Sequence, residues 1–135
     1  MFGPKTQRFF RTLAEWWVRP FAALGITPNM LTVAGLILAS ASAAAIAMNH
    51  LVWAAVLLFI GGAFDLSDGA LARVQNSRST FGAFFDSTLD RYSESVVLFG
   101  LIYRYGQRGQ TLELGVVFAA LVGSLMVSYT RARAE

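Results

Sequence analysis

The residues whose types and spacing could do chemistry are the aspartates. All four lie between positions 65 and 90, inside or at the ends of apolar segments: Asp65, Asp68, Asp86 and Asp90. An ionised carboxylate at membrane depth costs at least about 2.5 kcal/mol on insertion scales, so four of them require compensation by cations or by protonation. A functional site is therefore the default interpretation of this cluster.

Helical geometry predicts two faces that can confront each other. The arc of the first helix holds Asp65, Asp68, Gly69, Ala72 and Arg73. The arc of the second helix holds Gly82, Asp86 and Asp90. A short loop, 74–80, joins the two helices as antiparallel neighbours, so the carboxylates can converge at one edge of the membrane.

Carboxylate oxygens without histidine or cysteine suit Mg²⁺ or Mn²⁺ rather than zinc, and two ions could share four of them. Such a pair serves displacement at a pyrophosphate, because the ions neutralise phosphate oxygens and hold the attacking hydroxyl in line. The small residues Gly69, Ala72 and Gly82 leave room for a phosphate or a flat ligand, and Arg73 can clamp a phosphate oxygen. Two purely structural interpretations stay open. The small residues could serve helix packing alone, and the aspartates could form a structural ion-pair network with Arg91.

Composition indicates one membrane-embedded domain over residues 1–135. The chain is 56% hydrophobic and only 14% charged, which is too apolar for a soluble domain of this length. The absence of cysteine excludes disulfides, thiolate metal sites and cysteine nucleophiles. The net charge of +3 is small, and basic residues at segment ends suit anionic headgroups and phosphate substrates better than nucleic acid.

The elements that must position the aspartates are all helices. Residues 1–19 predict an amphipathic helix lying in the membrane interface, ended by Pro20, Gly25 and the turn at 27–29. Its apolar face holds Phe2, Phe9, Phe10, Leu13, Trp16 and Trp17. Four apolar segments, 30–48, 51–72, 81–103 and 112–129, approach the roughly 20 residues that span a bilayer.

The distribution of basic residues predicts the orientation. One side carries Lys5, Arg8, Arg11, Arg19, Arg73, Arg78, Arg131 and Arg133, and the other carries Arg104 and Arg108. Both termini and the aspartates are therefore expected at the cytoplasmic face of the cell membrane. His50, the only histidine, falls in the opposite turn and is interpreted as a solvated loop residue rather than a ligand or base.

The acidic stretch, written as a pattern, reads D-x2-D-G-x2-A-R-x8-G-x3-D-x3-D from Asp65 to Asp90. This pattern resembles the signature of the CDP-alcohol phosphatidyltransferases at every fixed position. The resemblance extends to Pro28, Asn29 and Thr32 at the start of the first span. Members of that family usually have six transmembrane helices, so the resemblance implies that a chain with four spans is a shortened form or a fragment.

The resemblance implies a transferase of phospholipid biosynthesis. The phosphatidyl group of a lipid such as CDP-diacylglycerol would pass to the hydroxyl of a small alcohol, with release of CMP. By resemblance, Asp65, Asp68 and Asp86 would ligate two Mg²⁺ or Mn²⁺ ions, and Asp90 would be a further ligand or the general base. The cytidine and pyrophosphate would be held by Gly69, Ala72, Arg73 and Gly82.

The acceptor alcohol depends on the end of the chain. Residues 128–135 are similar to the segment that ends the fourth helix of phosphatidylinositol-phosphate synthases, so Arg131 and Arg133 would face the phosphate of inositol phosphate. Anchoring at the inner leaflet explains the same two residues equally well. Glycerol 3-phosphate is a competing acceptor. A membrane prenyltransferase, an acid-lined divalent-cation transporter and a non-catalytic lipid-binding module are alternative classes, and formation of a homodimer is left open.

Overall fold

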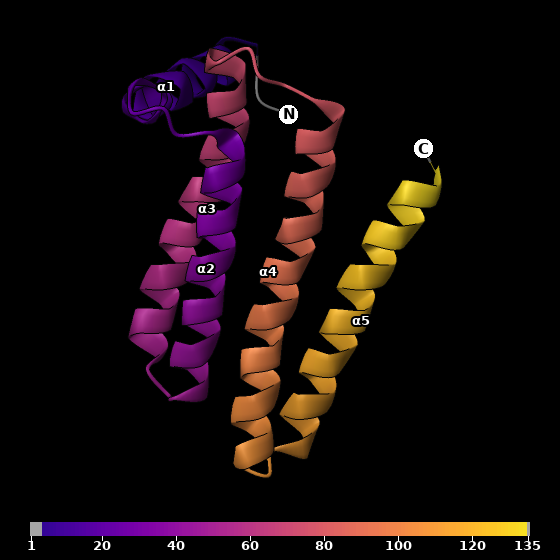
Figure 1. Ribbon diagram of the computed structural model, residues 1–135. Coiled ribbons are helices and arrows are strands. Elements are labelled where there is room, and N and C mark those ends of the chain that lie inside the picture. The colour runs from indigo at the N-terminus through magenta and orange to yellow at the C-terminus, as the bar shows by residue number, and fades with distance from the viewer. Residues whose placement is uncertain (1–3, 135) are drawn as a thin grey trace.

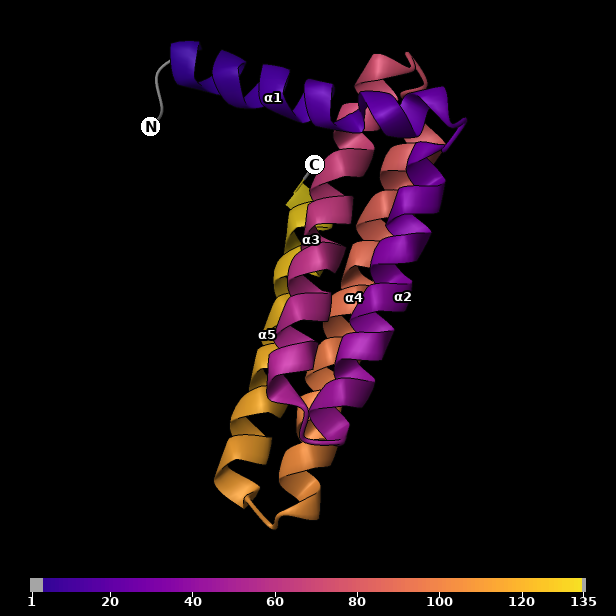
Figure 2. The ribbon, with the colours of Figure 1, turned by 90° about the vertical axis from the view of Figure 1, so that its left-hand side faces the viewer.

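The fold is all-helical across residues 4–134, which are the residues that the computed structural model describes. The helices are α1 (Pro4–Ala23), α2 (Pro28–Ala47), α3 (Leu51–Val74), α4 (Thr80–Gln107) and α5 (Thr111–Ala134). Helices α2 to α5 run up and down alongside one another, and α1 lies across one end of them (Figures 1 and 2). Helix α2 packs against both α3 and α4, α1 packs against α3, and α5 packs against α4.

Each of the four turns contains one residue with a left-handed backbone. These residues are Gly25, Asn49, Asn76 and Gly109, with φ of 72°, 66°, 49° and 64°. Glycine and asparagine tolerate this conformation at the end of a helix better than other residues do. The turns are therefore short, and the last three of them make each of the helices α3 to α5 antiparallel to the one before it (Figure 1).

Hydroxyl side chains cap two of the helices. The Thr27 hydroxyl accepts a hydrogen bond from the Met30 amide at 3.4 Å, and Pro28 follows in the first turn of α2. The Ser79 hydroxyl accepts from the Gly82 amide at 2.9 Å at the start of α4. These caps satisfy amides that have no partner within the helix.

The end of α1 differs from the prediction. We expected Pro20 to help end this helix, but α1 continues through Pro20 to Ala23. Proline removes only its own amide donor, and its carbonyl still accepts from the Leu24 amide at 3.1 Å. The helix ends at Ala23, and the left-handed Gly25 then lets the Ile26 amide donate back to the Phe21 carbonyl at 3.0 Å.

Other helix bounds shift by a few residues. Helix α4 runs four residues past the predicted segment 81–103, and α5 runs five residues past 112–129, so the basic end of the chain is helical as far as Ala134. Of the predicted apolar face of α1, only the Trp16 and Trp17 side chains fall within the described part, and both are exposed. Phe2 lies outside the described residues, as do the side chains of Phe9, Phe10 and Leu13.

The core is small and is built from small residues. Val18 of α1 is fully buried in a cluster with Leu31 of α2 and with Ala70 and Leu71 of α3. Farther along, a Cβ atom added at Gly100 of α4 would lie only 2.7 Å from a backbone carbonyl oxygen of α2. Such close approach is typical of transmembrane helices, whose contact surfaces favour glycine and alanine.

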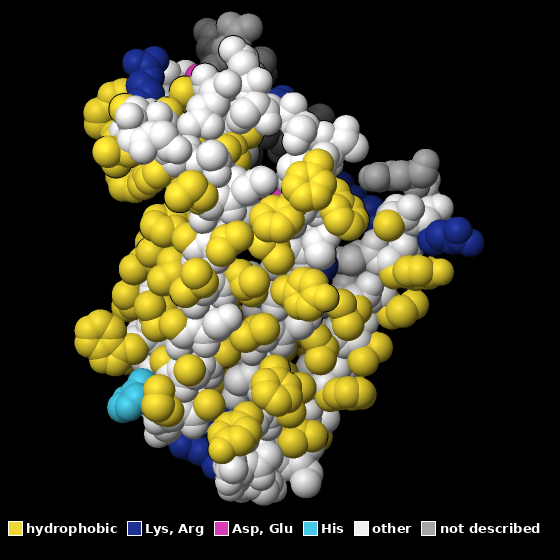
Figure 3. All heavy atoms as spheres, in the orientation of Figure 1, with side chains coloured by type: hydrophobic (Ala, Val, Ile, Leu, Met, Phe, Trp, Pro, Cys, Tyr) yellow, Lys and Arg dark blue, Asp and Glu magenta, His cyan; other side chains and the backbone are white. Residues whose placement is uncertain are grey.

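Most large apolar side chains point outward, as the space-filling view shows along the flanks of the helices (Figure 3). Within the described residues, three helices are long and apolar enough to cross a membrane: α2, α3 and α5. Helix α4 is not among them, because it carries five charged residues: Asp86, Asp90, Arg91, Glu94 and Arg104. The crossing of the membrane by 81–103 therefore stays a prediction.

Candidate functional site

The acidic residues gather where the second half of α3 meets the first half of α4. One carboxylate oxygen from each of Asp65, Asp68 and Asp86 lies within 4.8 Å of the other two. Asp65 and Asp68 are three residues apart on α3, so they share a face, and Asp86 faces them from α4. The predicted convergence of these three side chains is present, and their hard oxygen atoms are a donor set that suits Mg²⁺ or Mn²⁺.

Asp68 is the anchored member of this cluster. It is 5% exposed, and its Oδ2 accepts a hydrogen bond from the Thr32 hydroxyl at 2.7 Å. Thr32 lies on α2, is itself buried, and has its hydroxyl oxygen 3.1 Å from the Pro28 carbonyl oxygen. Three helices therefore contribute to the cluster, and one oxygen of Asp68 is held in place by a neutral donor.

A cavity of about 450 Å³ lies directly beside the carboxylates. It is lined by every residue of the sequence signature except Asp65 and Asp90: Asp68, Gly69, Ala72, Arg73, Gly82 and Asp86. The predicted small residues and the predicted arginine thus share one concave surface with two of the clustered aspartates. A bound phosphate could contact the backbone at either glycine, where no side chain intervenes.

Besides the Asp68 and Asp86 carboxylates, this cavity is lined by groups that favour an anion. Its wall includes the capping residues Thr27 and Ser79, so the positive ends of the α2 and α4 dipoles both meet it. Two guanidinium groups, those of Arg73 and Arg78, also line it. The Arg73 Nε atom is buried and has no hydrogen-bond partner among the described residues, and the nearest carboxylate oxygen, on Glu15, is 4.0 Å away. An incoming phosphate oxygen would satisfy such a donor.

Sequence reasoning missed part of this cavity. Arg78 and Asn29 line it, although the sequence analysis used Arg78 only for the charge balance and Asn29 only for the resemblance. Gln75 also lines it and donates from Nε2 to the Ile26 carbonyl at 2.7 Å, which ties the α3–α4 turn to the turn before α2. The position of Arg78 within the signature, just before the cap of α4, was the available signal.

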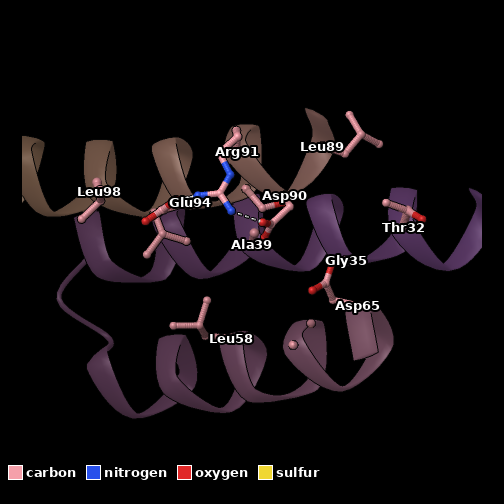
Figure 4. A pocket seen from close by; sticks show the side chains of 14 residues that line it. Thr32, Gly35, Ala39, Leu58, Asp65, Leu89, Asp90, Arg91, Glu94 and Leu98 are labelled. Carbon is pink, nitrogen blue, oxygen red and sulfur yellow. Dashed lines mark hydrogen bonds and ion pairs between the residues drawn. The ribbon is translucent and has the colours of Figure 1, made fainter. Parts of the chain in front are cut away.

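Asp90 is not one of the three carboxylates whose oxygens lie within 4.8 Å of one another. Together with Asp65 it lines a second cavity of about 480 Å³ between α2, α3 and α4 (Figure 4). Its Oδ2 accepts from Arg91 Nη2 at 2.5 Å, and Arg91 Nη1 donates to Glu94 Oε2 at 2.9 Å. The ion pairing with Arg91 that the sequence left open is therefore present at Asp90, but it does not include the other aspartates.

The two residues that were predicted to bind the acceptor's phosphate, Arg131 and Arg133, do not line the same cavity. Both residues lie in the last turn of α5 and are exposed, but only Arg131 lines a third cavity, of about 790 Å³, between α4 and α5. His50 is exposed in the α2–α3 turn, far from the carboxylates, as predicted (Figure 3).

Comparison with known proteins gives a consistent result. Residues 25–135 match the CDP-alcohol phosphatidyltransferase family. The archaetidylinositol phosphate synthase of Pyrococcus horikoshii is 40% identical over 117 residues, which are 87% of this chain and 60% of that protein. The phosphatidylinositol phosphate synthase of Corynebacterium glutamicum is 40% identical over 142 aligned positions, which cover 100% of this chain and 63% of that protein.

Solved structures of phosphatidylinositol phosphate synthases have a similar fold. The phosphatidylinositol phosphate synthase of Mycobacterium tuberculosis with manganese and citrate has a TM-score of 0.82 and 31% identity over 90% of this chain and 59% of that one. The same enzyme with CDP-DAG bound has a TM-score of 0.81 and 31% identity over 91% of this chain and 63% of that one. This chain therefore spans about 60% of the length of these relatives. From its signature, its fold and these matches, it follows that the chain belongs to the CDP-alcohol phosphatidyltransferase family.

Proposed function

We propose that this protein transfers the phosphatidyl group of a CDP-diacylglycerol-type lipid to the hydroxyl of a small phosphorylated alcohol and releases CMP. The observation that carries the proposal is the meeting of Asp65, Asp68 and Asp86 beside a cavity that is lined by Asp68, Asp86 and the signature residues Gly69, Ala72, Arg73 and Gly82. That arrangement joins a site for divalent cations to a site for a pyrophosphate. Relatives that are named as inositol phosphate lipid synthases support the same reaction class.

The nucleotide end of the donor lipid would occupy the cavity beside Asp68. Arg73 and Arg78 would bind oxygens of the pyrophosphate, and the two helix N-termini would add to the positive potential there. Glycine suits position 82, since a Cβ atom there would lie 3.1 Å from the Ser79 hydroxyl oxygen that caps α4. The structural neighbour with CDP-DAG bound supports this assignment.

The carboxylates would hold two Mg²⁺ or Mn²⁺ ions, with Asp90 as a further ligand or as the base. When bound, the ions neutralise phosphate oxygens and stabilise the departing phosphate of CMP. A neighbour that contains manganese supports the choice of a hard divalent cation. Thr32 contributes indirectly, because its hydroxyl orients the Asp68 carboxylate.

The chemical step conserves atoms and electrons. The acceptor hydroxyl oxygen attacks the phosphorus that carries the diacylglycerol, and a new P–O bond forms. The bond from that phosphorus to the bridging oxygen breaks, and CMP departs with its electron pair. Asp90, which lines the cavity next to Asp65, takes the proton of the hydroxyl.

The acceptor would bind between α4 and α5. This third cavity combines Arg131 with hydroxyl side chains, among them Thr88, Tyr92, Ser95 and Ser128. Hydroxyls suit a polyol and guanidinium groups suit a phosphate, so inositol phosphate fits the lining better than serine or another neutral alcohol does. Glycerol 3-phosphate is the competing acceptor, because it shares the phosphate but offers fewer hydroxyls. Arg133 would act from outside this cavity or would serve only to anchor α5.

The membrane arrangement follows from the same proposal. Helix α1 would lie in the cytoplasmic interface, its exposed Trp16 and Trp17 in contact with lipid, and α4 would cross the membrane with its charged half at the active site. The polar nucleotide would then stay at the cytoplasmic face while the acyl chains remain in the bilayer. Self-association into a homodimer stays a prediction.

The test is CMP release by the purified protein in detergent with CDP-diacylglycerol and Mg²⁺. Inositol phosphate, glycerol 3-phosphate, serine and inositol are supplied separately, and EDTA is the control. We expect release with inositol phosphate that EDTA abolishes. Absence of release with every acceptor, together with divalent-cation flux in vesicles, would instead support the transporter class.

A further inference from the structure

Arg91 is the only described residue that lines both the cavity containing Asp90 and the cavity containing Arg131. The first cavity, of about 480 Å³, lies between α2, α3 and α4, and the second, of about 790 Å³, lies between α4 and α5. Because its side chain projects from α4 at the boundary, its guanidinium can be shared between groups on the two sides. Nothing in the sequence signature assigns this residue a role.

On the first side, Arg91 is held by two carboxylates (Figure 4). Its Nη2 donates to Asp90 Oδ2 at 2.5 Å and its Nη1 donates to Glu94 Oε2 at 2.9 Å. A guanidinium has five N–H donors, so three remain for another ligand. The side chains of all three residues are 40% to 42% exposed, and ion pairs with that exposure add little net stability. Exchange of a carboxylate for a better anion is therefore inexpensive.

On the second side, the cavity is basic and rich in hydroxyls. Arg91 and Arg131 both line it, and its described lining includes no carboxylate. Two guanidinium groups around a cavity without acidic residues favour a dianion such as a phosphate monoester, which a guanidinium can bind through two parallel hydrogen bonds. Asp90 and Glu94 offer the same guanidinium one negative charge each, on two separate carboxylates, whereas a phosphate monoester carries both charges on one group.

We propose that Arg91 couples recognition of the acceptor's phosphate to release of the base. Before the acceptor binds, Arg91 holds the Asp90 carboxylate in an ion pair. The phosphate of the acceptor draws the guanidinium toward the α4–α5 cavity, and the freed carboxylate then accepts the proton of the acceptor hydroxyl. No covalent bond changes in this exchange, and the later proton transfer is the one in the proposed reaction, on which this inference rests.

The coupling would determine specificity as well as binding. A neutral alcohol cannot draw the guanidinium away from Asp90. The Asp90 carboxylate would then stay in its ion pair with Arg91 and would be a poorer acceptor for the proton of the alcohol. Phosphorylated acceptors would therefore be preferred both in KM and in kcat. Arg91 would act as a phosphate ligand and as a positioning residue for Asp90.

The experiment compares Arg91→Gln and Arg91→Lys with Arg104→Gln, a matched control on the same helix. Arg104 lies at the opposite end of α4, where its Nη2 donates to Asn49 Oδ1 at 3.1 Å. Binding of inositol phosphate and of inorganic phosphate is measured by calorimetry in EDTA without any CDP-lipid, and binding of CDP-diacylglycerol is measured separately. Turnover is then compared for inositol phosphate and inositol.

We expect Arg91→Gln to weaken binding of inositol phosphate by about tenfold or more, Arg91→Lys to weaken it less, and the control to leave it unchanged. The preference for inositol phosphate over inositol in kcat/KM should fall by a similar factor, while CDP-diacylglycerol binding stays at the wild-type value. Unchanged phosphate binding in Arg91→Gln, or an equal loss of turnover with both acceptors, would overturn the proposal.

Two further measurements distinguish a variant that does not fold from a failure of the proposed function. If Arg91→Gln does not fold, the test rests on Arg91→Lys, which keeps the positive charge but cannot make a bidentate contact with phosphate. Phosphate affinity in Arg91→Lys equal to that of the wild type would then count against the proposal. If the wild-type protein releases no CMP with any acceptor, the proposed function fails. The phosphate-binding measurement without CDP-lipid still tests Arg91 in that case.

Discussion

Among individual residues, Asp68 and Thr32 show how a charged site is held between apolar helices. The Asp68 carboxylate is buried, and it accepts a hydrogen bond across helices from the neutral hydroxyl of Thr32. A donor of this kind sets which oxygen faces the cation site. Orientation of a ligand by its neighbour commonly changes metal affinity by an order of magnitude or more.

Thr32→Val should therefore weaken Mn²⁺ binding by about tenfold, because valine keeps the shape but cannot donate to Asp68. Electron paramagnetic resonance of free Mn²⁺ during titration measures the affinity. Ser40→Ala is the matched control on the same helix, since the Ser40 hydroxyl donates only to the Leu36 carbonyl, at 2.8 Å, and is exposed. Equal Mn²⁺ affinity in Thr32→Val and in the wild type would show that the hydrogen bond does not orient the ligand.

Asp90→Asn should lower turnover by at least about a hundredfold while binding of the CDP-lipid is retained. The amide keeps the size of the side chain and can still pack beside Arg91, but it cannot take a proton from the acceptor. Single-turnover CMP release measures the chemical step, and CDP-lipid binding is measured on the same preparation. Activity close to that of the wild type would remove Asp90 as the base.

At the scale of elements, the site depends on how closely α2, α3 and α4 approach. Helix α2 carries Thr32 to the carboxylates at one end, and Gly100 lets α4 contact α2 near the other end. The registration of α4 against α2 and α3 decides whether Asp86 meets Asp68. Packing near one end of these helices therefore affects the geometry of the carboxylates at the other end.

Gly100→Ala should destabilise the protein by about 1–3 kcal/mol, because the new Cβ atom would lie 2.7 Å from the Ala43 carbonyl oxygen and 2.9 Å from its Cα atom. Both contacts are with backbone, which cannot rotate away. Thermal unfolding in detergent measures the effect. Gly115→Ala on α5 is the matched control, because nothing lies within 4 Å of a Cβ atom there. Equal unfolding temperatures for the two variants would argue against close α2–α4 packing.

At the scale of the whole molecule, the helices place charge at two ends and apolar side chains between them (Figure 3). Asp68 and Asp86 share one cavity with the helix caps Thr27 and Ser79. The transverse α1 lies across the end of the bundle where α2 begins (Figures 1 and 2). At the opposite end, Arg104 and Arg108 both donate to Asn49. This polarity predicts that the two ends face different compartments.

Cysteine labelling tests that prediction directly, because the chain has no cysteine of its own. Ser77→Cys places an exposed thiol in the α3–α4 turn, and His50→Cys places one in the α2–α3 turn. A membrane-impermeant maleimide applied to intact cells should label position 50 and not position 77, whereas inverted vesicles should show the reverse. Labelling of both positions from the same side would refute the orientation.

Much of the site was predictable from local patterns. The spacing of Asp65 and Asp68 places them on one helical face, and the short loop to the next helix makes Asp86 their neighbour, so convergence needed only helix geometry. The apolar runs likewise predicted helices, since a membrane leaves few other ways to satisfy backbone amides. The predicted break at Pro20 was wrong, because a proline at that point removes a single donor that α1 can lose.

The sequence by itself thus determined the helical class, the acidic cluster and the family, because these depend on contacts within one helix or between chain neighbours. Only the tertiary structure decided that the Thr32 hydroxyl donates to Asp68, 36 residues away in the sequence, and that Asp90 pairs with Arg91 in a second cavity. It also decided that Arg131 lines the cavity between α4 and α5 while Arg133 does not. Those outcomes depend on the rotation and registration of packed helices. Neither quantity is encoded in the periodicity of a single segment, because many rotations present an equally apolar surface to lipid.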